Sequence, residues 1–364
     1  MELFKAHNQW AIRPADETFS NVKTAFEAAR EYARTAAEKP DVPLTSIRAE
    51  ADGGEVCLTG KGGVPARVGN WAFGQLARIA EAPAGYLRTL PATLAVQNLN
   101  YGLKTASELH ADAKVNIFAH KNGDLLVRAL TSDKYRRIWN YEVLGRMLPL
   151  EAEGWSCPTP FRVRAEQVAK PDPTVYVSDH DMFAFLVSEN HRIMEPGNPD
   201  GLARGFFVEN SEVGASALRV TTFLYRYMCS NHIVWGAKDV SEIAVRHVGG
   251  ARGKLQTMFI GLTEYLNESA SEVEGKIKLA KNRLIDADPD KVLDAIFAKL
   301  RGQISRDALQ KSFLLASENA ATDGDPRSFW GLAQGVTRYS QTLAFADQRV
   351  QVDAAAAKVI DLAF

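Results

Sequence analysis

The chain has 364 residues, of which 46% are hydrophobic and 24% charged, so it can bury a sizeable core and wholesale disorder is excluded. Its 43 basic and 44 acidic side chains give a formal net charge of −1, which argues against a surface that coats a polyanion everywhere but allows a local basic patch. Cys57, Cys157 and Cys229 are odd in number and far apart in sequence, which argues against a disulfide framework and against a CxxC zinc site.

The length predicts roughly two domains at about 150 residues each. No stretch of about 18 apolar residues is present, and the start, MELFKAHNQW, lacks the basic and apolar regions of a secretory signal. We therefore expect a cytoplasmic protein.

The first part of the chain predicts helices around a hairpin. Apolar residues recur at helical spacing over 22–38, and Ser20 or Asn21 can cap that helix. Asp52-Gly53-Gly54 between two strand-like runs predicts a β-hairpin. Two short helices then break at Ala82-Pro83, and Pro91 ends the second or begins a third.

From about residue 113 the pattern changes to strands, with a hairpin at Asn122-Gly123-Asp124 and long runs rich in Val, Phe, Tyr and Thr. The glycine-rich break 249–253 precedes a tail of helical periodicity, in which Pro289 and Pro326 mark helix starts. The fold class predicted is α+β, with a strand-rich central antiparallel or mixed sheet flanked by helices. We expect three parts: 1–112 with a helical hairpin, 113–253 as the strand-rich core, and 254–364 as the helical region.

The densest segment for function is 205–236. Arg219 and Arg226 can share a face with aromatic residues there, in either strand or helical register. Arginine binds phosphate through two parallel hydrogen bonds, and aromatic rings stack on unpaired bases. The alternative is that these arginines form ion pairs with Glu209 and Glu212 of the same domain.

Residues 201–254 contain seven Lys and Arg against four acids, an excess of three in a chain that is neutral overall. Arg246, Arg252 and Lys254 surround the glycine-rich turn, where exposed backbone amides can hold a phosphate. The spacing departs from the GxxxxGK[ST] phosphate loop, and a flexible hinge is the other interpretation of this turn.

A second basic and aromatic run spans residues 132–141. Tyr135, Arg136, Arg137 and Trp139 alternate rings and guanidinium groups, which suits a groove for single-stranded nucleic acid. The alternative is a loop into a helix capped by Asn140, with Tyr135 and Trp139 closing the core.

Catalytic signatures are weak. No HExxH, GxSxG or GxGxxG motif is present, and no cofactor is predicted. Asp179, His180, Glu189 and His191 can supply metal ligands once folded, although local clusters of such common polar residues are more typical of solvated turns.

Several of these segments resemble the phage/plasmid-like protein family known as domain of unknown function 932. The similar segments are HNQWAIRPADETF, FGQLARIAEAPAGYLRTLP, SDKYRRIWN, FFVENSEVGASALRVTTFLYRYMCSN, RHVGG and WGLAQGVTRYSQTLAFADQRVQVDAAA, which together span nearly the whole chain. The resemblance implies a role in a mobile genetic element, and it assigns no catalytic residue.

The leading hypothesis is a mobile-element protein that binds nucleic acid, with single-stranded DNA favoured, in replication, recombination or DNA protection, working as a homo-oligomer. The predicted contacts are Arg136, Arg137, Arg219, Arg226, Arg246, Arg252 and Lys254 to phosphate, and Tyr135, Trp139, Tyr225 and Tyr227 to bases. The alternative is a non-catalytic module that binds a host protein through its helical tail. A metal-dependent hydrolase is the third hypothesis.

Overall fold

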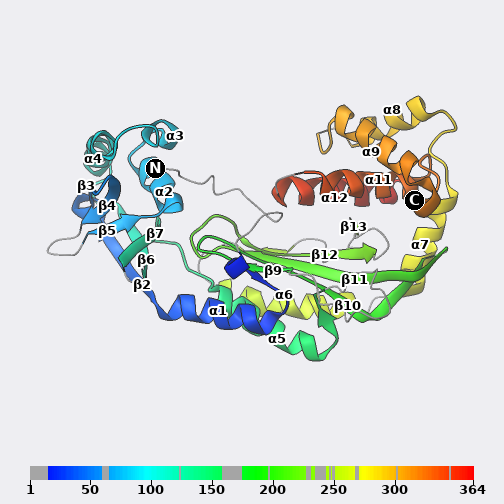
Figure 1. Cartoon of the computed structure of the whole chain (residues 1–364), viewed down its shortest axis with the longest axis horizontal. Coiled ribbons are helices and arrows are strands. Elements are labelled where there is room, and N and C mark those ends of the chain that lie inside the picture. Colours follow the sequence, from blue (N-terminus) through cyan, green and yellow to red (C-terminus); the bar gives the residue numbers. More distant parts are fainter. Residues whose placement is uncertain are drawn as a thin grey trace.

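The computed structural model has an elongated shape with three parts (Figure 1). A six-stranded sheet with its own helices forms one end, an eight-stranded sheet lies in the middle, and a group of helices forms the other end. The structure describes residues 15–59, 65–122, 124–157, 174–195, 197–226, 231–233, 243–245, 247, 251–266, 270–300, 302–343 and 346–364.

The six-stranded sheet has the order β2-β6-β7-β5-β4-β3, and its pairs are antiparallel except β5 with β7. Its strands are β2 (Ala36–Pro43), β3 (Arg48–Asp52), β4 (Glu55–Thr59), β5 (Ala66–Val68), β6 (Lys114–Asn122) and β7 (Asp124–Ser132). Helices α2 (Asn70–Ile79), α3 (Ala84–Leu87) and α4 (Ala92–Leu109) pack against one face.

Local signals set several of these boundaries. Gly53 and Gly54 both have positive φ (53° and 86°), as a two-residue hairpin turn needs, so the predicted hairpin at this point is confirmed. The hairpin predicted at residues 122–124 is confirmed by the β6–β7 pairing. Short 3-10 helices lie at Ala15–Glu17 and Leu44–Ser46.

Helix α1 (Val22–Arg34) begins where predicted, because the Asn21 side chain accepts a hydrogen bond from the Thr24 amide at 2.8 Å. It ends earlier than its alanine-rich sequence predicts. Ala36 already belongs to β2, since β6 offers it a partner strand and pairs with it from Ala36 to Pro43.

The eight-stranded sheet is antiparallel throughout, with the path β1-β9-β10-β11-β12-β13; β8 adds to β10 and β14 adds to β12. Its strands are β1 (Thr18–Phe19), β8 (Trp155–Ser156), β9 (Val175–Val177), β10 (Met182–Glu195), β11 (Asn198–Asn210), β12 (Leu218–Arg226), β13 (Asn231–Ile233) and β14 (Ile243–Val245). One face packs against α1, α5 (Asn140–Ala152) and α6 (Ala251–Leu266), which lie below the sheet in Figure 1.

The opposite face of this sheet carries a row of phenylalanines. Phe185 stacks on Phe223 with ring centroids 4.8 Å apart, and Phe183 lies 5.3 Å from Phe207. Gly205 pairs with Phe223 in the ladder, and a Cβ at Gly205 would come within 2.1 Å of that ring. Glycine at this position therefore gives the phenylalanine room to lie flat across the sheet.

The helical end contains α7 (Ala270–Asn282), α8 (Pro289–Lys299), α9 (Arg306–Glu318), α10 (Ala320–Asp323), α11 (Phe329–Gln341) and α12 (Ala346–Asp361). Pro289 opens α8 as predicted, whereas Pro326 lies in the turn before α11, whose N-cap is Ser328. Its core also includes Ile193 and Leu202 from the eight-stranded sheet, so this end is not a separate globule.

The architecture confirms the α+β class predicted from the sequence. Strands β6 and β7 pair with β2 and β5, so the sheet at the N-terminal end crosses the boundary expected at residues 112–113. In the part of the chain that the structure describes, no helix is long and apolar enough to cross a membrane.

Candidate functional site

The turn between β11 and β12, residues 210–214, lies where the two sheets meet. Its first four residues are at most 2% exposed. Trp71 Nε1 and Gln75 Nε2, both on α2, donate to the Val213 carbonyl oxygen at 3.0 and 2.8 Å. The Asn-Ser-Glu-Val-Gly sequence therefore joins the eight-stranded sheet to the six-stranded one.

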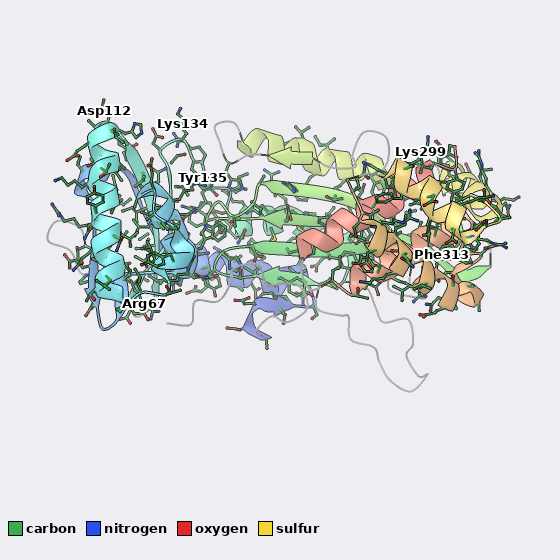
Figure 2. All side chains as sticks on the ribbon, turned by 90° about the horizontal axis from the view of Figure 1, so that it is seen from above. Arg67, Asp112, Lys134, Tyr135, Lys299 and Phe313 are labelled. Carbon is green, nitrogen blue, oxygen red and sulfur yellow. The ribbon has the colours of Figure 1, made fainter. Side chains whose placement is uncertain are left out.

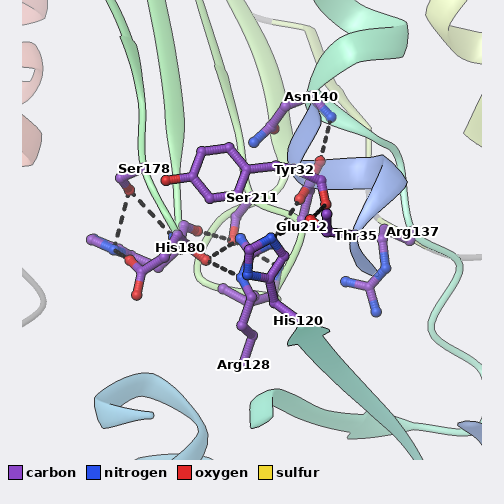
Figure 3. Close-up of polar contacts among 12 residues, drawn as sticks. Tyr32, Thr35, His120, Arg128, Arg137, Asn140, Ser178, His180, Ser211 and Glu212 are labelled. Atoms are coloured by element: carbon purple, nitrogen blue, oxygen red, sulfur yellow. Dashed lines mark hydrogen bonds and ion pairs between the residues drawn. The ribbon is translucent and has the colours of Figure 1, made fainter. Parts of the chain in front are cut away.

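Glu212 is the charged residue of this turn, and it faces a buried arginine. Its Oε2 lies 3.5 Å from Nη1 of Arg128 on β7, and its Oε1 accepts from the Asn140 amide at the start of α5 at 2.8 Å. Burial raises the pKa of Glu212, and the Arg128 charge opposes that rise. Arg128 Nε also donates to the Asp179 carbonyl at 2.8 Å, so one guanidinium contacts two loops of the other sheet (Figure 3).

Tyr135 and His247 form the second contact of the junction. The Tyr135 hydroxyl donates to the Ser211 carbonyl at 2.9 Å and lies 2.8 Å from His247 Nδ1. Because the phenol has only one hydrogen, which it donates to Ser211, His247 donates from Nδ1 in this contact. Burial, with the nearby charge of Arg137, lowers the pKa of His247 to about 4. Burial also raises the pKa of Tyr135, which keeps the phenol protonated.

Arg137 lies inside the junction as well. Its guanidinium carbon sits 3.5 Å from the centroid of the Phe118 ring, and its Nε donates to Glu38 on β2 at 2.5 Å. The side chain is only 5% exposed. A cation against a ring face and beside a carboxylate is stable at such a buried position.

We call these five side chains the junction cluster: Arg128, Tyr135, Arg137, Glu212 and His247. They come from the β7 and β11–β12 regions, the loop before α5 and the segment before α6. All are covered, Tyr135 less completely than the rest, so they are not placed to touch a substrate. Their arrangement fixes the two sheets and the flanking loops relative to one another.

The C-terminal end of α1 borders the junction cluster. Thr35 Oγ1 lies 2.5 Å from His120 Nε2, and the Tyr32 ring lies 5.3 Å from the His120 ring (Figure 3). Burial, followed by the charge of Arg128, lowers the pKa of His120. Helix α1 of the middle part is thereby tied to β6 of the end sheet.

The residues of the metal hypothesis lie in the β9–β10 loop and along β10. His180 Nδ1 lies 2.7 Å from Asp179 Oδ1, so these two side chains are hydrogen-bonded to each other. The side chains of Glu189 and His191 lie outside the described residues. Among the side chains that the structure describes, no group of three or more His, Cys, Asp or Glu is placed to hold a metal ion.

Two basic segments meet beside the junction cluster, residues 132–137 and 243–254. The Arg136 amide donates to the His247 carbonyl at 2.8 Å, and the Tyr135 and His247 rings stack with centroids 5.1 Å apart. Lys134 and Arg136 are exposed, and Figure 2 shows Lys134 projecting from this end of the molecule. Because α6 begins at Ala251, the second segment runs into the first turn of that helix.

The structure places the predicted nucleic-acid contacts in different surroundings. Arg219 is 46% exposed and lies 3.4 Å from Glu209, its partner across the β11–β12 ladder. This is one of the two ion pairs named in the alternative. Trp139 is half-buried with its ring 5.7 Å from Phe118, and Tyr135 is also half-buried, as the core-closing alternative describes.

The structure does not describe the side chains of the other predicted nucleic-acid contacts in the central block and the glycine-rich turn. Arg252 and Lys254 belong to the first turn of α6, and Tyr225 and Arg226 end β12, but the structure describes only the backbone at these four positions. Arg246 and Tyr227 lie outside the described residues.

Sequence reasoning missed Arg128 entirely, and it treated His247 only as part of a glycine-rich turn. Arg128 sits in the apolar run LLVRALT, where a lone charge inside a strand is itself a signal that a buried partner exists. The sequence suggested Glu212 as an ion-pair partner of Arg219 or Arg226, whereas the structure pairs it with Arg128. No sequence signal connects it to a residue 84 positions away.

Comparisons with known proteins identify a family and nothing more specific. The profile of the family described as Domain of unknown function (DUF932) matches residues 129–358, which contain most of the junction cluster and both basic segments. The similar segments near the N-terminus and in 73–91 lie outside this range. No curated protein matches the chain, and no solved structure matches it. The match covers well over half of the chain, which therefore belongs to the family of the Domain of unknown function (DUF932).

Proposed function

We propose that the chain binds nucleic acid, single-stranded DNA in particular, through the surface formed by its two basic segments. The observation that carries the proposal is the hydrogen bond between the Arg136 amide and the His247 carbonyl. It joins segments 132–137 and 243–254, which the sequence singles out separately as basic.

The charge of this surface supports the proposal. The two segments contain six Lys and Arg and a single acid, Asp133, in a chain whose overall charge is −1. Arg137 is neutralised by Glu38, which leaves five cations for one acid. Positive charge concentrated in one place on a neutral protein attracts a polyanion to that site without attracting polyanions to the rest of the surface.

The proposed contacts divide between the two segments. Lys134 and Arg136 come from the first, and Arg246, Arg252 and Lys254 come from the second, which runs into the N-terminal turn of α6, where the helix dipole favours an anion. Tyr135 and Trp139 are half-buried and pack against the rings of His247 and Phe118, so base stacking falls to Tyr225 and Tyr227 in this proposal.

The test is a fluorescence anisotropy titration with a labelled oligothymidylate across a range of salt concentrations. About four phosphate contacts predict a slope near −3 when log affinity is plotted against log salt concentration. The triple variant Lys134→Gln/Arg136→Gln/Lys254→Gln should reduce the steepness by about 2 and weaken binding at low salt at least about tenfold.

The control removes three exposed lysines from the helical end, Lys278→Gln/Lys291→Gln/Lys299→Gln. It changes the net charge by the same amount and should leave both affinity and slope close to those of the parent chain. Absence of binding at low salt, or equal losses in the two triple variants, would overturn the proposal. Membership of a mobile element's replication, recombination or DNA-protection system is the biological setting that we propose for this binding.

A further inference from the structure

The two basic segments come from different sheets. Segment 132–137 follows β7 of the six-stranded sheet, and segment 243–254 begins with β14 of the eight-stranded sheet. In Figure 2, Lys134 and Tyr135 lie where these two parts of the molecule meet. The distance between the two segments therefore depends on how the end sheet is docked on the middle of the molecule.

Burial alternates along the first segment. Lys134 and Arg136 are exposed. Tyr135 is half-buried between them, and the side chain of Arg137 is 5% exposed. The two inward side chains bind different parts of the molecule, because Arg137 contacts Glu38 of the end sheet and Tyr135 contacts the middle. The exposed cation of Arg136 is thus held between two anchors.

Tyr135 reaches both the second segment and the middle sheet. Its hydroxyl donates to the Ser211 carbonyl at 2.9 Å and lies 2.8 Å from His247 Nδ1. Its ring stacks on the His247 ring with centroids 5.1 Å apart. Because His247 belongs to the second segment, this one phenol fixes the first segment to the second and to the turn between β11 and β12.

The spacing of two cationic segments decides how tightly a polyanion binds to both. Each segment alone offers few phosphate contacts, and once a strand has bound one segment its contact with the other is intramolecular. The effective concentration for that second contact is set by the distance and stiffness between the segments. A fixed spacing keeps it high, since little conformational freedom is lost when the strand binds.

We propose that Tyr135 is a positioning residue for nucleic acid, whose hydroxyl holds the two basic segments at a spacing that lets a single strand contact both. The inference rests on the nucleic-acid binding proposed above. It gives Tyr135 a role other than base stacking. It also defines the ligand as a strand long enough to span both segments, because a dinucleotide contacts one segment and gains nothing from the spacing.

The experiment measures the anisotropy of a labelled oligothymidylate across a range of salt concentrations with the full chain. Tyr135→Phe removes the hydroxyl and keeps both the ring and the net charge. We expect the affinity at low salt to fall about tenfold. The steepness of the salt dependence should fall by about 1.4, as though two phosphate contacts had been lost, although no cation has been removed. Labelled dinucleotide should bind both proteins equally weakly.

Tyr265→Phe is the matched control. The Tyr265 hydroxyl also donates to a backbone carbonyl, that of Phe223, at 2.7 Å. This variant loses a hydrogen bond of the same kind and should keep the affinity and the salt slope of the parent. In a Lys134→Gln/Arg136→Gln background, adding Tyr135→Phe should cause no further loss of affinity, because Tyr135 acts through these two cations.

Pulsed EPR measures the spacing without nucleic acid. Spin labels go to Lys134→Cys and Gln256→Cys, both at exposed positions, in a chain whose own three cysteines are replaced by alanine. The parent should give one narrow distance distribution, and Tyr135→Phe should broaden it.

The outcomes separate the inference from the proposed function. A parent chain that binds no oligothymidylate would remove the proposed function and this inference with it. A parent chain that binds, with Tyr135→Phe keeping its affinity and salt slope, would overturn the inference alone. The inference is equally overturned by a distance distribution that stays narrow in Tyr135→Phe, or by a further loss of affinity in the glutamine background.

Discussion

Glu212 and Arg128 are both almost fully buried, with side chains 2% and 3% exposed. Removing two charges from water costs several kcal/mol each, and a direct ion pair at 3.5 Å does not repay that alone. Two further hydrogen bonds offset this cost: the Asn140 amide donates to the Glu212 carboxylate, and the Arg128 guanidinium donates to the Asp179 carbonyl. The pair is therefore better understood as fixing one arrangement of the two sheets than as a source of stability.

His247 gives the junction a dependence on pH. Its pKa of about 4 in the fold lies below the ordinary value of 6.5, so the unfolded chain takes up a proton first as pH falls. The contribution of His247 is complete above about pH 6.5 and is lost progressively toward pH 4. Between pH 7.5 and pH 5 we expect His247 to reduce the free energy of unfolding by about 2 kcal/mol.

Urea denaturation at the two pH values checks this. His247→Asn should be less stable at pH 7.5 and should show a smaller loss on acidification than the parent. His110→Asn, a substitution at an exposed position, should keep the parent's loss. Equal acid sensitivity in the parent and His247→Asn would contradict the assignment of a neutral ring.

At the scale of elements, the edge strand β3 shows how the end sheet avoids pairing with other chains. The Asn100 side chain on α4 binds both backbone groups of Ala49: its Oδ1 accepts from the amide at 2.9 Å and its Nδ2 donates to the carbonyl at 2.8 Å. An amide side chain thus takes the place of a neighbouring strand at Ala49, the second residue of β3.

Asn100→Ala should destabilise the protein by roughly 1–3 kcal/mol, because two backbone groups lose their partners. It should also increase aggregation on gentle heating, since the free edge can pair with another chain. Thermal melts with light scattering measure both effects. Gln97→Ala, at an exposed position on the same helix, is the control and should behave as the parent. A variant at Asn100 that melts and scatters like this control would refute the role of the amide.

At the scale of the whole molecule, the middle sheet belongs to two cores at once. Its central stretch packs on α1, α5 and α6, whereas Ile193, Leu202 and Leu224 are buried among the helices of the far end. The helical end therefore depends on the sheet for part of its own core.

Leu202→Ala should cost about 2–5 kcal/mol, as other large-to-small changes at fully buried positions do. Hydrogen exchange should show the loss mainly in α7–α12 and β11, with α2–α4 little changed. Leu130→Ala in the core of the end sheet is the matched variant and should give the opposite pattern. Uniform loss of protection in both variants would mean that the molecule opens only as one unit.

Local signals in the sequence were sufficient for much of the fold. The Asn21 cap, the two hairpins and Pro289 each depend on residues a few positions apart, and each was predicted. Strand β2 was not, because Ala36 to Glu38 continue a helical pattern and only the partner β6 draws them into a sheet.

The site was harder to predict for the same reason. Arg137 has the sequence context of an exposed phosphate contact, yet Phe118 and Glu38, the latter 99 positions away, enclose it. Contacts of such separation leave no periodicity or spacing to detect. The sequence singles out segments 132–141 and 246–254 separately as basic; their contact through the Arg136 amide and the His247 carbonyl is visible only in three dimensions.

The bond between Arg136 and His247 also has a consequence for synthesis of the chain. Tyr135 and His247 are separated by 112 positions, so a ribosome has to release the second segment before the first has its neighbour. Closing so long a loop is slow and late in folding. A partly made chain accordingly presents segment 132–137 without segment 243–254, and the surface that we propose for nucleic acid is complete only once translation has passed the start of α6.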